Sequence, residues 1–121
     1  MELKIKGKRA LITGGSRGIG LGVAQLLAQE GCHLHLAARR QKDLDAARGN
    51  ILRTAKVEVT CHAVDLSDST NAVALARECS DVDFLVNNAG SIPQGTLASL
   101  DDATWRRAWD LKVFGFIDIT R

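Results

Sequence analysis

The sequence predicts an α/β fold in which an open sheet of parallel strands is doubly wound, with helices on both faces. Two observations carry this prediction. Short apolar runs alternate along the chain with amphipathic segments of helical period, as in repeated βαβ units. The first apolar run also passes directly into a glycine-rich turn that opens a helix. Parallel connections are right-handed, and 3-2-1-4 is a common order in doubly wound sheets, so we expect a βαβαβαβ core with that strand order, followed by a final helix.

The first half of the chain holds two strand-and-helix units. Strand 9–13 ("RALIT") leads through the glycine turn into a helix that Gly31 ends. We expect this helix to bury one apolar stripe, made of Ile19, Val23, Leu26 and Leu27. A second strand at 32–38 ("CHLHLAA") precedes another helix. The residues expected to face inward from that helix are Leu44, Ala47, Ile51, Leu52 and Ala55.

The third strand, 57–64 ("VEVTCHAV"), has one polar face, which indicates a strand at or near a sheet edge. Ser67 is the predicted N-cap of a third helix. Its inward residues are expected to be Ala72, Val73, Ala76 and Cys79. A fourth strand at 82–87 ("VDFLVN") is more uniformly apolar than the third, which is typical of a central strand. Residues 88–99 indicate a loop, and Ser99 with Asp102 forms a predicted capping box for the last helix.

Composition limits the class of protein. A chain of 121 residues with 45% hydrophobic content suits one domain, residues 1–121. The 16 basic and 14 acidic residues are mixed along the chain, so nothing indicates a nucleic-acid or membrane surface. The three cysteines are widely spaced, which suits a reducing compartment, and no apolar run reaches membrane-spanning length. We expect a cytoplasmic protein.

The glycines at 14, 18 and 20 in "TGGSRGIG" follow a strand and open a helix. Such a turn lets a pyrophosphate approach bare backbone N–H groups at the positive end of a helix dipole. A plain strand-to-helix turn is the alternative. An NTPase phosphate loop is disfavoured, because the lysine followed by Ser or Thr is missing. The sequence therefore predicts a Rossmann-type dinucleotide-binding domain.

Three motifs, at residues 13–20, at Asp65 with Leu66, and at 87–90 ("NNAG"), resemble the N-terminal half of a classical short-chain dehydrogenase/reductase. The resemblance covers nearly the whole chain. It implies that Asp65 accepts a hydrogen bond from the adenine amino group and that the "NNAG" backbone passes close to the adenosine ribose. Taken singly, Asp65 could instead be a capping or loop aspartate, and "NNAG" an ordinary turn after a strand.

Charge at the end of the second strand favours NADP(H). A carboxylate there usually binds the ribose 2′-hydroxyl of NAD and would repel a 2′-phosphate. Here two alanines precede Arg39 and Arg40, and Arg17 comes from the glycine turn. We expect Arg39 rather than Arg40 to bind the phosphate; the alternative is that these arginines are solvated surface charges. The predicted cofactor-binding residues are Thr13, Gly14, Ser16, Arg17, Gly18, Ile19, Gly20, Arg39, Asp65, Leu66, Asn87, Asn88, Ala89 and Gly90.

Three histidines raise the question of a metal. His33 and His35 share one face of a strand, and His62 lies on the next strand along the chain. No Cys, Asp or Glu completes a convincing ligand spacing in the sequence. We therefore expect packed histidines and no metal.

The resemblance implies hydride transfer between a nicotinamide and a small carbonyl or alcohol, with a proton supplied by the tyrosine of a "YxxxK" motif. This sequence contains no tyrosine. Family members are about twice as long, as the two halves of the fold require. We expect a cofactor-binding domain truncated before the catalytic half and inactive alone. The alternatives are a non-catalytic NADP(H)-binding module and an inactive truncated relative.

Lys112 is the one candidate catalytic residue. It lies on the apolar stripe of the last predicted helix, seven residues after Trp105, where the resemblance implies a catalytic asparagine. Its ammonium group could replace that of the "YxxxK" lysine, or the proton relay could be altered. The lysine could also pack its stem on Trp109 and extend its charge to solvent. We further expect a homo-oligomer, because the fourth strand would leave an apolar sheet edge.

Overall fold

The computed structural model describes residues 4–88 and 119–120. Its strands are β1 (Arg9–Thr13), β2 (His33–Ala38), β3 (Val59–Ala63) and β4 (Phe84–Val86). The helices between them are α1 (Gly18–Gln29), α2 (Gln41–Leu52) and α3 (Ser69–Glu78). All strand pairs are parallel and the sheet order is β3-β2-β1-β4. The predicted fold class and strand order are confirmed.

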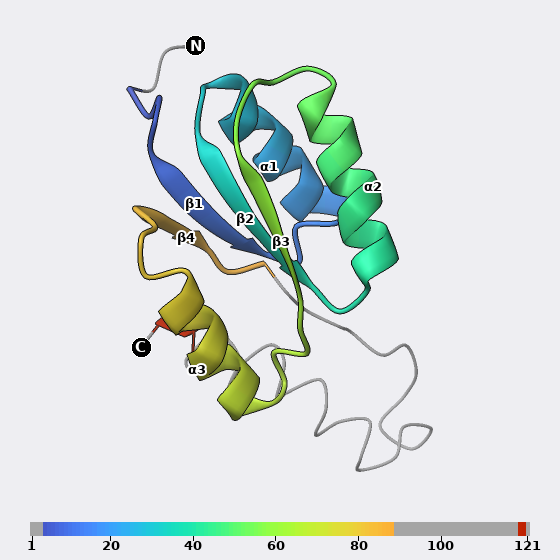
Figure 1. The fold of residues 1–121 in the computed structure, drawn as a ribbon, viewed down its shortest axis with the longest axis vertical. Coiled ribbons are helices and arrows are strands. Elements are labelled where there is room, and N and C mark those ends of the chain that lie inside the picture. The colour runs from blue at the N-terminus through green and yellow to red at the C-terminus, as the bar shows by residue number, and fades with distance from the viewer. Residues whose placement is uncertain (1–3, 89–118, 121) are drawn as a thin grey trace, which may run out of the picture.

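The sheet has helices on both faces (Figure 1), with α1 and α2 on one side and α3 on the other. Side chains of β1 alternate between the two faces. Ile12 packs in the cluster with Ala24 of α1 and Leu44 of α2, whereas Leu11 packs in the cluster with Leu75 of α3. Because both faces are covered, β1 and β2 are mostly apolar, as in other doubly wound sheets.

The buried face of helix α1 differs from the predicted apolar stripe. Ile19 and Leu26 are 79% and 65% exposed, and the fully buried residues are instead Gly20, Ala24 and Ala28. The helix lies so close to the sheet that a Cβ at Gly20 would stand 2.2 Å from the Gly14 carbonyl oxygen. Such a close approach selects small side chains. The larger Val23 and Leu27 are partly buried at the border of this contact.

Helix α2 follows its predicted pattern more closely. Leu44, Ala47 and Ile51 are buried as expected. Leu52 is exposed, because the helix ends there, and Ala55 lies beyond the helix and is only partly buried.

The N-cap of helix α3 is one residue later than predicted. Its N-cap is Asp68, whose Oδ1 accepts the Thr70 backbone N–H at 2.9 Å. Ser67 was expected in this role, but its hydroxyl donates to Asp65 Oδ1 at 2.6 Å instead. Ala72 and Cys79 are buried as predicted, whereas Val73 is exposed. An aspartate caps at least as well as a serine, so the shift has a simple local cause.

The two outer strands of the described sheet are β3 and β4. The prediction of β3 at an edge is confirmed, and its Thr60 is exposed. The more uniformly apolar β4 was expected to be central, yet among the described residues it pairs only with β1 and Phe84 is 39% exposed. The predicted loop, the capping box and the last helix lie outside the described residues. Within the described part of the chain, no helix has the length and apolar character to cross a membrane.

Candidate functional site

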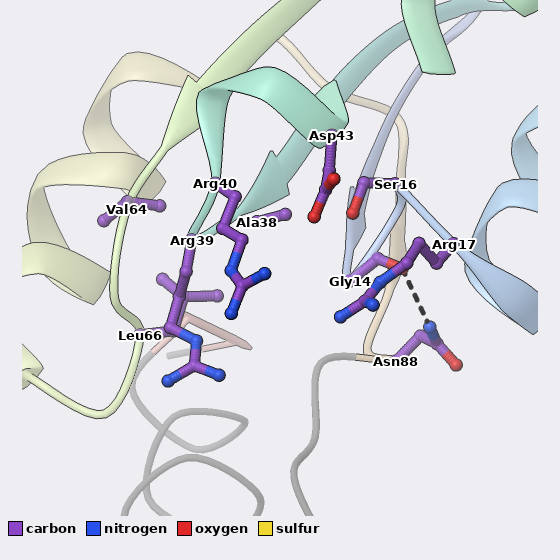
Figure 2. Close-up of a pocket in the computed structure, with 10 residues that line it drawn as sticks. All are labelled: Gly14, Ser16, Arg17, Ala38, Arg39, Arg40, Asp43, Val64, Leu66 and Asn88. Atoms are coloured by element: carbon purple, nitrogen blue, oxygen red, sulfur yellow. Dashed lines mark hydrogen bonds between the residues drawn. The ribbon is translucent and has the colours of Figure 1, made fainter. Parts of the chain in front are cut away.

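A cavity of about 220 Å³ opens at the carboxyl ends of the strands (Figure 2). Loops from all four strands contribute to its wall, because parallel strands end at the same edge of the sheet. The lining residues are Gly14, Ser16, Arg17, Ala38, Arg39, Arg40, Asp43, Val64, Leu66 and Asn88. The structure therefore brings six predicted cofactor-binding residues together, namely Gly14, Ser16, Arg17, Arg39, Leu66 and Asn88.

The glycine turn has the backbone that an anion site needs. Gly14 and Gly18 have φ of +69° and +57°, a region that favours glycine. Helix α1 begins at Gly18, has no side-chain cap at Arg17 and no acidic residue in its first turn. A Cβ at Gly18 would meet nothing within 4 Å, so a ligand can approach the backbone there. An uncapped helix N-terminus beside an open approach fits a pyrophosphate.

Thr13 and Asn88 hold this turn in place. The Thr13 hydroxyl lies 3.3 Å from the Val86 carbonyl oxygen, to which it donates, and accepts the Asn88 backbone N–H at 3.0 Å. The Asn88 side-chain Nδ2 then donates to the Gly14 carbonyl oxygen at 3.2 Å, the dashed line in Figure 2. These bonds tie the end of β4 to the turn after β1. Gly20 completes the contact, since a Cβ there would also stand 2.6 Å from Asn88 Nδ2.

Three arginines and one aspartate set the charge of the cavity. Figure 2 shows the guanidinium groups of Arg17, Arg39 and Arg40 directed toward the same open space. Asp43, in the first turn of α2, lines the same cavity. Sequence reasoning missed Asp43, although an acid in the first turn of the second helix is at the same sheet edge as the end of the second strand. The cavity is thus basic, with one carboxylate in its wall.

Asp65 and Leu66 follow β3 at the border of the cavity. Leu66 is 4% exposed and lines the cavity. Asp65 is exposed, and its Oδ1 accepts both the Ser67 hydroxyl at 2.6 Å and the Ser67 backbone N–H at 3.0 Å. The Ser67 hydroxyl, with help from the Ser67 N–H and the Arg39 charge, holds the pKa of Asp65 below its ordinary value. This carboxylate is therefore ionised at neutral pH, and its adenine contact stays a prediction.

The other predicted residues have different surroundings. Ile19 is exposed at the start of α1. The Asn87 side-chain Nδ2 donates to the Thr120 hydroxyl at 2.9 Å, and its buried Oδ1 has no hydrogen-bond partner among the described residues. Ala89, Gly90 and Lys112 lie outside the described residues.

Comparison with known proteins agrees with this geometry. A model of the short chain dehydrogenase family matches residues 8–121. The chain belongs to the short chain dehydrogenase family. The 2-keto-3-deoxy-L-fuconate dehydrogenase of Xanthomonas campestris is 32% identical over 110 residues, which cover 91% of this chain and 35% of that protein. This chain spans less than half the length of the curated relatives it matches first.

Two solved structures are similar to this chain in fold and sequence. The L-sorbose reductase of Gluconobacter frateurii, complexed with NADPH and L-sorbose, has a TM-score of 0.91 and 34% identity; the match covers 100% of this chain and 48% of that one. A metagenomic short-chain oxidoreductase in complex with NADP has a TM-score of 0.87 and 32% identity, covering 96% of this chain and 54% of that one.

Proposed function

We propose that this chain is the NADP(H)-binding portion of an oxidoreductase that moves a hydride between the cofactor and a small carbonyl or alcohol. One observation carries the proposal: the glycine turn, the uncapped start of α1 and three arginines border a single cavity. Membership of the short chain dehydrogenase family supports the reaction class. The NADPH and NADP bound in the similar structures support the choice of cofactor.

Each part of the cavity suits a different part of the cofactor. The first-turn N–H groups of α1 would hold the pyrophosphate. Arg39 would bind the 2′-phosphate through a planar fork of donors, with Arg17 and Arg40 adding positive charge. Leu66 offers an apolar wall for the adenine, and Asp65 an acceptor for its amino group. The roles of Ile19, Asn87, Ala89 and Gly90 stay predictions from the resemblance.

NADPH supplies the hydride when it is bound. The contribution of the described residues is to bind and orient it, with Thr13, Gly20 and Asn88 fixing the turn that meets the pyrophosphate. Lys112 is the candidate for a role in proton transfer, and that role stays a prediction.

Titration calorimetry with NADPH and NADH tests the proposal. We expect Arg39→Ala to weaken NADPH binding by roughly 10- to 100-fold, because a charge-assisted hydrogen bond is worth about 1.5–3 kcal/mol. NADH affinity should change far less, because NADH lacks the 2′-phosphate. A clear preference of the unaltered chain for NADH would contradict the assignment of NADP(H).

Arg53→Ala is the matched control. Arg53 follows the end of α2, is exposed and donates to Asn50 Oδ1, and it does not line the cavity. Its removal should leave both affinities unchanged. If Arg40→Ala reproduces the loss and Arg39→Ala does not, the phosphate contact belongs to Arg40.

A second candidate function is an NADP(H)-binding module without turnover. Two measurements separate the candidates. One is NADPH oxidation with a panel of ketones and aldehydes, and the other is the reading frame beyond Arg121. A downstream "YxxxK" motif with measurable turnover favours the enzyme. Tight NADPH binding with no turnover in the full-length protein favours the module.

A further inference from the structure

Three side chains outside the cavity lining bring potential metal ligands together on the α3 face of the sheet. His35 lies on β2, His62 on β3 and Cys79 at the end of α3, with all three ligand atoms within 4.8 Å of one another. His35 Nδ1 is 2.9 Å from His62 Nε2, and Cys79 Sγ is 3.6 Å from that same nitrogen. His35 and Cys79 are buried, and His62 is partly buried. The sequence argument against a metal was that no Cys, Asp or Glu completes a ligand spacing, and the structure places Cys79 beside His35 and His62.

A carboxylate lies close to the outer nitrogen of each of the two imidazole rings. His35 Nε2 lies 3.3 Å from Asp81 Oδ1, and His62 Nδ1 lies 3.3 Å from Glu78 Oε2. The first contact has a suitable distance but not the direction of a hydrogen bond, since His35 Nε2 has no hydrogen-bond partner within the described ranges. Histidines that bind metals commonly direct their other nitrogen to a carboxylate in this way.

The two neutral imidazoles of His35 and His62 do not have enough N–H protons to satisfy every contact in the cluster. Each neutral imidazole carries one N–H. If both protons face the carboxylates, His35 Nδ1 and His62 Nε2 oppose each other with two lone pairs at 2.9 Å. If one proton lies between these nitrogens, one outer nitrogen meets its carboxylate without a proton. A cation between the inner nitrogens removes both conflicts.

We propose that His35, His62 and Cys79 bind a divalent transition metal of the zinc class, with Asp81 and Glu78 orienting the two rings. Two imidazoles and a thiolate suit Zn²⁺ or Co²⁺ and not the oxygen-preferring Mg²⁺ or Ca²⁺. Bonds of about 2.0 Å to nitrogen and 2.3 Å to sulfur place tetrahedral ligands about 3.3 Å (N–N) and about 3.5 Å (N–S) apart. Two separations here are 2.9 and 3.6 Å. The third, between the ligand atoms of His35 and Cys79, is within 4.8 Å, so metal binding would draw these two side chains together.

Binding exchanges the Cys79 proton for the metal. The S–H bond breaks, the sulfur–metal bond forms and one proton passes to solvent. Three protein ligands leave a fourth position for water, as in open zinc sites.

Cobalt titration of the full chain, reduced and stripped of metal with a chelator, tests this proposal. We expect one Co²⁺ per chain, with visible bands typical of tetrahedral cobalt and a thiolate-to-cobalt band in the near ultraviolet, all abolished by Zn²⁺. Cys79→Ala should remove the thiolate band. His62→Asn should raise the dissociation constant by more than about tenfold.

The chain offers matched controls for both ligand types. Cys61→Ala and His33→Asn alter the same residue types on the same two strands, but Cys61 contacts the Leu44 carbonyl oxygen and His33 accepts the Glu58 N–H. Both should keep the full cobalt spectrum. Glu78→Gln changes an exposed side chain, so it should preserve folding while weakening the metal by about 10- to 100-fold. A chain that gives no cobalt bands, or bands that survive Cys79→Ala and His62→Asn, would overturn the proposal and leave the histidines as packing groups.

Discussion

At the scale of single residues, cofactor choice depends on the charges in the cavity wall. The three arginines noted in the sequence line one cavity, because Arg39 and Arg40 follow β2 and Arg17 belongs to the turn after β1. The sequence did not predict Asp43, whose carboxylate lines the same cavity. A carboxylate near a bound 2′-phosphate would oppose part of the attraction that the arginines supply.

Replacing Asp43 should therefore strengthen NADPH binding. We expect Asp43→Asn to raise NADPH affinity about 2- to 10-fold, because like charges about 4 Å apart repel by roughly 1 kcal/mol in water and more near a protein surface. NADH affinity should not rise. Calorimetry at low and high salt checks both points, since screening should reduce the gain.

Asp45→Asn is the control for this change. Asp45 lies on the same helix, accepts from the Gln41 side chain at 2.8 Å and does not line the cavity. A fall in NADPH affinity for Asp43→Asn would mean instead that Asp43 contacts the cofactor directly, for example at a ribose hydroxyl.

At the scale of elements, the packing of α1 shows where a pattern of large apolar residues misleads. The helical period of Ile19, Val23, Leu26 and Leu27 is real, but the face that meets the sheet is defined by small residues. Only glycine at position 20 permits the approach of α1 to the Gly14 carbonyl. The same approach places the start of α1 at the carboxyl edge of β1, where an anion can meet its free N–H groups.

The two glycines at 20 and 22 provide a direct test of this packing. Gly20→Ala should lower the free energy of unfolding by about 1–3 kcal/mol, because the added methyl collides with backbone. Gly22→Ala should raise it by about 0.5–1 kcal/mol, because that methyl meets nothing within 4 Å and alanine favours a helix.

Urea denaturation of the two variants gives both free energies. The variants make the same chemical change two residues apart in one helix, so helix propensity cancels between them. Equal stabilities for Gly20→Ala and Gly22→Ala would contradict the close approach of α1 to the glycine turn.

At the scale of the whole molecule, the doubly wound sheet brings distant segments to one edge. Residues 13, 39, 66 and 88 are far apart in sequence, yet each ends or follows a parallel strand, and parallel strands all end on the same side. The hydrogen bonds of Thr13 and Asn88 then lock β4 to β1 at that edge. The cavity exists because the sheet topology brings these residues together, so the arrangement of its wall depends on the folding of the entire sheet.

Cofactor binding should therefore stabilise the whole described fold. At NADPH concentrations of about 100 times the dissociation constant, the gain is about 2.7 kcal/mol. For a domain of this size we expect the melting temperature to rise on the order of 10 °C. Differential scanning fluorimetry with NADPH, NADH and free adenosine gives the comparison. No rise with NADPH would favour the alternative of a truncated relative that binds nothing.

Assembly and location stay predictions at this scale. The partly exposed Phe84 of β4 lies at one edge of the described sheet, which is consistent with the expected association of copies. Light scattering at several protein concentrations measures the oligomeric state.

The sequence by itself determined the strand order, the glycine turn and the basic end of β2. These features are local: a strand, a tight turn and a helix start each depend on neighbouring residues and on the fixed handedness of parallel connections. The tertiary structure alone decided which face of α1 is buried, that Asp43 joins the cavity, and that Cys79 meets His35 and His62. Each of these depends on which segments pack across the sheet, and contacts between segments far apart in the chain leave no periodic signal in one sequence.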